Sequence, residues 1–198
     1  MESLNKKLKI FSEQCNSCKK CQSECEFLKC YGKPKEIAEA FFAGKIDGTV
    51  AFECNLCQLC NAVCPVGLHP EKMFLEMRRY AQESENPFFK KHKRILAYER
   101  CGTSKRYTWY GLPDKCETIF FPGCTLPGTR PSITFRLFKL LQKQIPTLGV
   151  VLDCCTKPSH DLGRTSYFNT VFQEMRSFLI DNGIKHVLVA CAAHSACC

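Results

Sequence analysis

Eight cysteines in the N-terminal third of the sequence form two runs with the same spacing, C-x-x-C-x-x-C-x-x-x-C. The first run consists of Cys15, Cys18, Cys21 and Cys25, and the second consists of Cys54, Cys57, Cys60 and Cys64. Three thiolates at consecutive two-residue separations can wrap one corner of a cubane cluster in a tight turn, while a fourth thiolate arrives from elsewhere. The duplicated run therefore predicts two 4Fe-4S clusters.

The fourth cysteine of each run is expected to serve the other cluster, as in the bacterial ferredoxin pattern. Cys64 would then complete the site begun by Cys15, and Cys25 the site begun by Cys54. The second run ends in Cys64-Pro65, as the pattern demands, whereas the first run continues with Glu26. Zinc is the alternative, but structural zinc usually takes two C-x-x-C pairs across a loop, and four cysteines this closely spaced would crowd a tetrahedral ion. Inert thiols are a further alternative.

The cysteine content also bears on the compartment. The sequence has 17 cysteines in 198 residues, an odd number, and no apolar signal segment follows its N-terminus. We therefore expect a cytoplasmic protein whose thiols hold metal or do redox chemistry, rather than a secreted disulfide scaffold. No apolar run reaches the length of a membrane span, so membrane association is expected only through a partner.

The formal charge of +9 overstates the positive charge of a loaded protein. A cubane held by four thiolates carries about −2, so two of them would bring the chain to about +5. No aromatic interleaving and no nucleic-acid-binding motif accompanies the basic residues, so nucleic acid is not expected as a partner. The main basic group is a predicted solvated or partner-facing surface that comprises Lys90, Lys91, Lys93, Arg94, Arg100, Lys105 and Arg106.

Helices are predicted on either side of the second cysteine run. Proline opens a helix at 34–42 and another near 70–81, where apolar residues recur with helical periodicity, and a third helix is expected to start at Pro87. These elements predict a helical two-cluster domain over residues 1–100. Residues 101–117, which contain glycine and proline, are the predicted connector.

The pattern changes to alternating strands and helices in the C-terminal part. Short apolar runs at 118–121, 148–152 and 186–190 predict strands, and amphipathic segments at 132–145 and 165–182 predict helices. The order β-α-β-α-β implies a small parallel sheet with right-handed crossovers over residues 118–198. The expected fold class is thus α + α/β, with the helical ferredoxin-like domain first.

Four further cysteines follow the predicted strands at their carboxyl ends, where open α/β sheets place their sites. They are Cys124, Cys154, Cys155 and Cys191. Consecutive side chains leaving a strand diverge, so Cys154 and Cys155 are not expected to be core residues together. Cys30, Cys101 and Cys116 have no motif spacing and are expected to pack in the core or connector. No Walker loop, G-x-G-x-x-G or G-x-S-x-G motif is present, and we identify no complete substrate site.

These C-terminal motifs resemble the cysteine-rich CCG domain of heterodisulfide reductases and of the iron–sulfur subunits of anaerobic glycerol-3-phosphate and 2-hydroxy-acid dehydrogenases. The matching segments are FPGC at 121–124, DCCTKP at 153–158 and AC at 190–191. The helical domain is similar to the two-cluster domain that precedes the CCG domain in those subunits. The resemblance implies an anaerobic electron-transfer subunit that relays electrons between a flavoprotein (FAD-containing) partner and a quinone, cytochrome, ferredoxin or disulfide acceptor, together with further electron-transfer subunits. It also implies a third metal or iron–sulfur centre at Cys124, Cys154, Cys155 and Cys191.

The sequence departs from that family in two ways. His194 stands where the family's closing cysteine belongs, so His194 and Cys197 are both candidate ligands of the third centre. The sequence contains one CCG repeat where the family usually has two, so heterodisulfide reduction by this chain alone is not expected. Two alternatives to the relay remain: a reductase of a disulfide or another small substrate at a CCG-bound cluster, and a zinc-stabilised adaptor.

Overall fold

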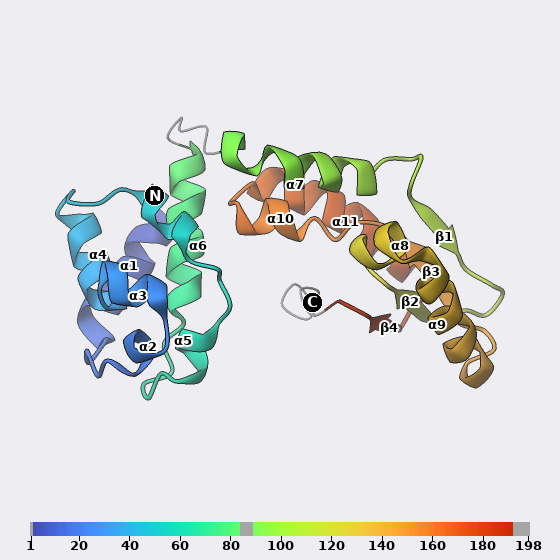
Figure 1. Ribbon diagram of the computed structural model, residues 1–198, viewed down its shortest axis with the longest axis horizontal. Coiled ribbons are helices and arrows are strands. Elements are labelled where there is room, and N and C mark those ends of the chain that lie inside the picture. The colour runs from blue at the N-terminus through green and yellow to red at the C-terminus, as the bar shows by residue number, and fades with distance from the viewer. Residues whose placement is uncertain (1, 84–88, 192–198) are drawn as a thin grey trace. The chain divides into compact units, whose positions relative to one another are not determined.

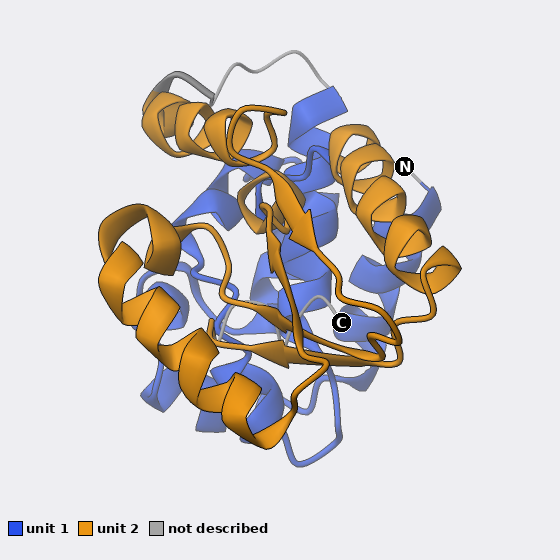
Figure 2. Ribbon diagram, turned by 90° about the vertical axis from the view of Figure 1, so that its right-hand side faces the viewer, with its two compact units in different colours: residues 1–90, 161–164 blue, residues 91–160, 165–198 orange. Residues whose placement is uncertain are grey.

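The computed structural model describes residues 2–83 and 89–191, and it is rich in helix with one small mixed sheet. The chain forms two compact units, coloured separately in Figure 2. Unit 1 comprises residues 1–90 and 161–164, and unit 2 comprises residues 91–160 and 165–198. None of the helices among the described residues has the length and apolar character needed to cross a membrane.

Unit 1 is helical and contains both cysteine runs (Figure 1). In chain order its elements are α1 (Glu2–Gln14), α2 (Lys20–Ser23), α3 (Glu26–Tyr31), α4 (Pro34–Phe42), the 3₁₀ helix η1 (Gly48–Glu53), α5 (Leu59–Ala62) and α6 (Pro70–Glu83). The predicted helices at 34–42 and 70–81 correspond to α4 and α6, and both begin at the proline that marks them. Helix α1 was not predicted.

The core of unit 1 lies where α1 packs against α4 and α6. Leu8 of α1, Ile37 of α4, and Met73 and Met77 of α6 are fully buried there. The apolar stripe of α6 therefore faces the core, as its periodicity predicts. These contacts hold together the segments from which the two cysteine runs extend.

Unit 2 combines helices with the sheet. In chain order its elements are α7 (Phe89–Gly102), β1 (Trp109–Gly111), β2 (Thr118–Phe121), α8 (Thr125–Thr129), α9 (Pro131–Gln144), β3 (Gly149–Leu152), α10 (Lys157–Asp161), α11 (Thr165–Asp181) and β4 (His186–Val189). The three predicted strands and the two long predicted helices are all present. Pro87, the expected start of α7, lies outside the described residues.

The sheet has the strand order β1-β3-β2-β4. β2 is parallel to both β3 and β4, which agrees with the β-α-β-α-β prediction. The prediction of a purely parallel sheet is wrong, however, because β1 pairs antiparallel with β3, with Tyr110 opposite Val151. Three residues that end in glycine give too little periodicity to predict a strand, so the sequence pattern places this segment in the connector.

Helices cover both faces of the sheet. Phe120 and Val150 pack with residues of α9 on one face. Ile119 and Val151 pack with residues of α11 on the other face. Neighbouring strand residues alternate between the two faces, so β2 and β3 are buried on both sides.

Helix α7 belongs mostly to unit 2, although the predicted boundary was near residue 100. Glu99 of α7 is almost fully buried and accepts a hydrogen bond from the Ser159 backbone N–H at 2.9 Å. The Tyr98 hydroxyl donates to the Cys124 carbonyl at 3.1 Å. These long-range contacts, which no local pattern encodes, attach α7 to the sheet unit.

Candidate functional site

The two cysteine runs fold into turns with the same backbone conformation. Ser17 and Lys19 in the first run have φ of 57° and 65°, and Leu56 and Gln58 at the equivalent positions have φ of 52° and 65°. A short helix then starts in each run, α2 after Lys19 and α5 after Gln58. Left-handed conformation is rare for residues other than glycine, so its recurrence at matched positions shows that the repeat is structural as well as sequential.

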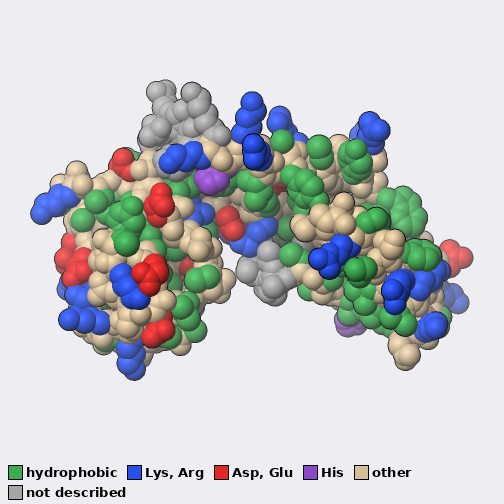
Figure 3. Space-filling model, viewed as in Figure 1, with side chains coloured by type: hydrophobic (Ala, Val, Ile, Leu, Met, Phe, Trp, Pro, Cys, Tyr) green, Lys and Arg blue, Asp and Glu red, His purple; other side chains and the backbone are tan. Residues whose placement is uncertain are grey.

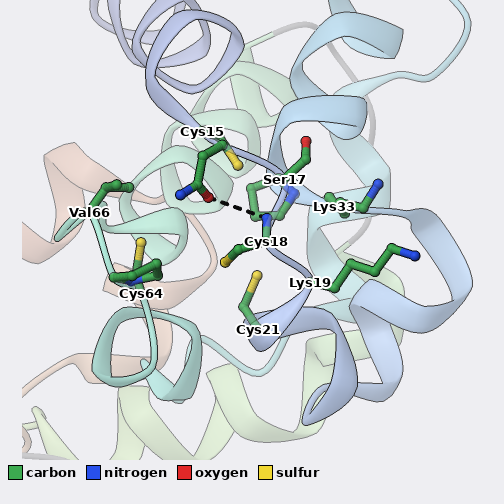
Figure 4. A pocket seen from close by; sticks show the side chains of 11 residues that line it. Cys15, Ser17, Cys18, Lys19, Cys21, Lys33, Cys64 and Val66 are labelled. Atoms are coloured by element: carbon green, nitrogen blue, oxygen red, sulfur yellow. Dashed lines mark hydrogen bonds between the residues drawn. The ribbon is translucent and has the colours of Figure 1, made fainter.

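The first three cysteines of run one share a pocket with the last cysteine of run two. Cys15, Cys18, Cys21 and Cys64 all line it, and their sulfur atoms face a common space in Figure 4. Burial and the neighbouring thiols, including Cys64, raise the pKa of Cys21. The arrangement therefore brings together the four residues that the ferredoxin pattern assigns to one cluster.

The complementary four thiols lie close to one another in the same unit. Burial raises the pKa of Cys54, and the nearby Cys25 and Cys57 contribute to that rise. Burial, followed by the charges of Cys54 and other neighbours, raises the pKa of Cys60 to about 12. Each group has one exposed cysteine, Cys18 in the first and Cys57 in the second. The second group also has two buried members, Cys54 and Cys60, each 8% exposed, whereas the remaining cysteines of the first group are half-buried.

Backbone N–H groups point at some of these sulfurs. The Leu56 N–H donates to Cys54 Sγ at 3.4 Å, and the Leu68 N–H donates to Cys64 Sγ at 3.3 Å. The Cys18 N–H instead donates to Asn16 Oδ1 at 3.2 Å, drawn as the dashed line in Figure 4. Hydrogen bonds to sulfur stabilise thiolate ligands and are one means by which proteins adjust cluster potentials.

The chemistry of the donors fits an iron–sulfur cluster. All eight cysteines of the two runs are free thiols. A single zinc ion needs its thiolate ligands grouped tightly, since each Zn–S distance is about 2.3 Å. Within the described part of the chain, no three His, Cys, Asp or Glu side chains are grouped so as to hold a single metal ion. The six thiols of the two equivalent turns, with Cys25 and Cys64, are the donor type that cubane clusters use.

Three of the C-terminal cysteines meet in unit 2. Cys124 follows β2, and Cys154 and Cys155 follow β3. A hydrogen bond with Cys154 lowers the pKa of the Cys124 thiol, and the hydrogen bonds of Cys154 with Cys124 and Cys155 raise the pKa of Cys154. Cys154 and Cys155 are both buried, which the expectation of diverging side chains did not anticipate.

The backbone after β3 explains how both cysteines are buried. β3 ends at Leu152, so strand alternation no longer applies beyond it. The Asp153 carboxylate accepts from the Cys154 N–H at 2.6 Å, and Thr156 adopts a left-handed conformation with φ of 53°. This turn lets Cys155 join the apolar cluster beneath α11.

The other predicted ligands of the third centre are not brought into that group. Cys191 follows β4 and is half-buried, and among the described residues it forms no hydrogen bond with the three clustered thiols. Phe121 pairs with Val189, so the carboxyl ends of β2 and β4 are nevertheless neighbours. His194 and Cys197 lie outside the described residues.

Cys101 was expected to pack in the core or the connector, and it lines the same cavity as Cys124. A cavity of about 460 Å³ is lined by Cys101, Cys124 and Asp153 together with aromatic, glycine and other apolar residues. At Gly102, an added Cβ would lie 3.0 Å from the Cβ of Cys154. No local spacing signals this position, because the end of α7 approaches the sheet only through tertiary contacts.

Comparisons with known proteins agree with the cysteine geometry. A family model described as the 4Fe-4S dicluster domain matches residues 14–69, a range that contains all eight cysteines of the two runs. Neither a comparison with curated proteins nor one with solved structures found a match. The matched domain and the thiol arrangement together define an iron–sulfur protein with an electron-transfer role. The match does not extend into unit 2.

Proposed function

We propose that this chain is an iron–sulfur subunit of an anaerobic multi-subunit oxidoreductase and that it relays electrons through two 4Fe-4S clusters. The observation that carries the proposal is the pair of equivalent cysteine turns, each approached by the fourth cysteine of the other run. Two adjacent one-electron carriers suit a relay between a two-electron donor and a second acceptor.

In this proposal each cluster has four thiolate ligands. One cluster would be held by Cys15, Cys18, Cys21 and Cys64, and the other by Cys54, Cys57, Cys60 and Cys25. The clusters supply reversible one-electron chemistry when bound. The protein's contribution is to hold three sulfurs in each of two equivalent turns, to bring the fourth cysteine of each run to the other turn, and to direct the N–H groups of Leu56 and Leu68 at two of the eight sulfurs.

The proposed partners are a flavoprotein with FAD and further electron-transfer subunits. The sequence has no dinucleotide-binding motif of its own, so hydride chemistry would belong to another chain. Lys93, Arg94 and Arg100 of α7 are exposed. Figure 3 shows Lys and Arg side chains protruding over unit 2. Such a surface would favour fast association with an acidic partner at low salt.

A third centre in unit 2 is part of the proposal. Cys154 forms hydrogen bonds with both Cys124 and Cys155, and Cys191 is the proposed fourth ligand because β4 ends beside β2. Four thiolates of this kind suit a soft metal or an iron–sulfur unit.

The cavity beside Cys124 favours a second candidate function, the reduction of a disulfide or another small substrate in unit 2. Its volume of about 460 Å³ falls in the range of small-molecule sites, and its lining combines apolar groups with two thiols and one carboxylate. The test is turnover of a small disulfide by dithionite-reduced protein. Loss of that turnover in Cys124→Ser, with turnover retained in Cys30→Ser, would favour the reductase.

Metal and sulfide analysis of anaerobically purified protein tests the relay. We expect about eight iron and about eight acid-labile sulfide per chain, with any iron beyond that assigned to unit 2. Reduction should give the EPR signals of two interacting reduced clusters. Zinc without sulfide would overturn the relay in favour of a zinc-stabilised adaptor.

A further inference from the structure

Arg78 places a positive charge inside unit 1, beside the second cysteine run. The residue lies on α6 and is only 6% exposed. Its guanidinium donates to the Ala51 carbonyl at 3.0 Å, to the Asp161 carbonyl at 2.5 Å and to the Cys54 carbonyl. The same group lies over the Phe52 ring, 5.3 Å from its centroid. The fork of N–H groups is thus fixed by main-chain acceptors around the start of that run.

These acceptors satisfy the hydrogen bonds of Arg78 but do not neutralise its charge. No carboxylate among the described residues forms an ion pair with it. Burial lowers the pKa of Arg78, whereas the nearby Cys54 and, after it, Asp161 favour the charged form. Buried charges are costly unless they are paired, so Asp161 and any negative charge held by the neighbouring cysteine run would both stabilise the guanidinium.

The second cysteine run lies beside the guanidinium, which donates to the main-chain carbonyl of Cys54. Cys54 is the first of the charged neighbours that act on Arg78, and Arg78 in turn favours the Cys54 thiolate. Because Cys54 and Cys60 are buried, little water is available to screen the interaction. A four-thiolate cluster at this position would bring about two net negative charges to the guanidinium.

Among the residues that the structure describes, the first group of thiols has no equivalent buried cation. Lys19 and Lys33 line its pocket, but Lys19 is exposed and the Lys33 ammonium is paired with Glu36 at 2.5 Å. Solvent and the carboxylate weaken the field of both lysines at the sulfurs. The two groups therefore differ in their electrostatic surroundings although their turns match.

We infer that Arg78 is a buried counter-charge that raises the reduction potential of the centre held by Cys54, Cys57, Cys60 and Cys25. This inference rests on the proposed two-cluster function and deepens it. Uptake of one electron makes a thiolate-bound cluster more negative, from about −2 to about −3, and a nearby fixed positive charge favours that change. Arg78 thereby makes the second centre the preferred site for the electron.

The test measures the midpoint potential of each centre by EPR-monitored redox titration of anaerobic protein. Arg78→Gln removes the charge, and Arg78→Lys keeps it. Arg79→Gln is the matched control, since Arg79 is the next residue on α6 and pairs with Glu76 at 2.7 Å. Signals are assigned with Cys18→Ala and Cys57→Ala, which occupy equivalent positions in the two runs.

Support for the inference is a more negative potential of the Cys57-dependent signal in Arg78→Gln, an unchanged Cys18-dependent signal, and no shift of either in Arg79→Gln. Unchanged potentials in Arg78→Gln, or equal shifts of both signals, would overturn it. If Arg78→Gln binds less iron, Arg78→Lys decides: a wild-type potential supports a charge effect, and a lowered potential contradicts it. Failure of both variants to load the second centre would show that Arg78 acts only through the fold, which also overturns the inference.

These outcomes are separable from failure of the relay itself. Wild-type protein without about eight iron and eight sulfide would refute the proposed two clusters before any variant is compared. With the clusters present, only the potentials bear on Arg78.

Discussion

At the scale of single residues, the left-handed backbone conformation at matched positions of the two cysteine runs has an unfavourable conformational free energy. Lys19 and Gln58, each with φ of 65°, directly precede the short helices that contain Cys21 and Cys60. A residue other than glycine in this conformation costs roughly 1–2 kcal/mol. In the first run this conformation accompanies three cysteines that line one pocket, an arrangement that suits one corner of a cluster.

Substitution of Cys64 should therefore disturb the cluster site of the first run and leave the cluster site of the second run intact. We expect Cys64→Ala to lose about half of the iron and to remove the same EPR signal as Cys18→Ala, because both side chains line one pocket. Cys30→Ala is the control, since Cys30 is an exposed cysteine outside both runs. A spectrum that matches Cys57→Ala instead would refute the exchange of fourth ligands.

At the scale of elements, α1 is the support of the cluster unit that the sequence analysis missed. Its buried face consists of Leu4, Leu8 and Phe11, which pack with α4 and α6. The helix ends at Gln14, immediately before Cys15, so its packing fixes where the first run begins.

Truncation of that face should weaken the unit. We expect Leu8→Ala to cost about 2–5 kcal/mol, since Leu8 is fully buried and its removal leaves a cavity. The measurement is the urea concentration at which cluster absorbance and helical circular dichroism are lost under anaerobic conditions. Lys6→Ala on the exposed side of the same helix should leave both midpoints almost unchanged. Equal midpoints for Leu8→Ala and the wild type would argue against a supporting role for α1.

The end of α7 plays a comparable part in unit 2. An added Cβ at Gly102 would lie 3.0 Å from the Cβ of Cys154 and 3.5 Å from the Cβ of Cys124. Only a residue without a side chain lets the helix approach the thiols this closely.

We accordingly expect Gly102→Ala to destabilise unit 2 by about 1–3 kcal/mol through overpacking and to speed alkylation of Cys154. The readout is the rate of thiol labelling in folded, metal-free protein, followed by mass spectrometry. Arg100→Ala, two residues away on the exposed side of α7, is the control. Labelling that is no faster in Gly102→Ala than in this control would contradict the close approach.

At the scale of the whole molecule, the two units are expected to hold metal independently. All cysteines of the two runs lie in unit 1, and the adjacent Cys154 and Cys155 lie in unit 2. Replacing both Cys154 and Cys155 by Ala should leave about eight iron in place and abolish any metal beyond that. Iron and sulfide analysis beside the wild type and Cys30→Ala checks this. Loss of the first eight iron in the double variant would show that the units depend on each other.

Much of this architecture follows from short-range patterns in the sequence. The spacing of three cysteines two residues apart predicts a cluster-binding turn by itself, because a single turn contains all three. Helices α4 and α6 and strands β2, β3 and β4 were likewise predictable, since proline at a helix start and runs of apolar residues are local signals. The 4Fe-4S dicluster family model matches residues 14–69, the segment that contains both cysteine runs.

The remaining features depended on residues far apart in the chain, and only tertiary packing decided them. Cys64 shares a pocket with Cys15 because α1, α4 and α6 pack together. Residues 109–111 form the strand β1 because they pair with β3. The charge of Arg78 is buried only because main-chain carbonyls of η1 and its surroundings close around it. Periodicity places an arginine on one side of α6. The burial of its side chain, its hydrogen-bond partners and the effect of its charge on the cysteine run depend on the assembled fold.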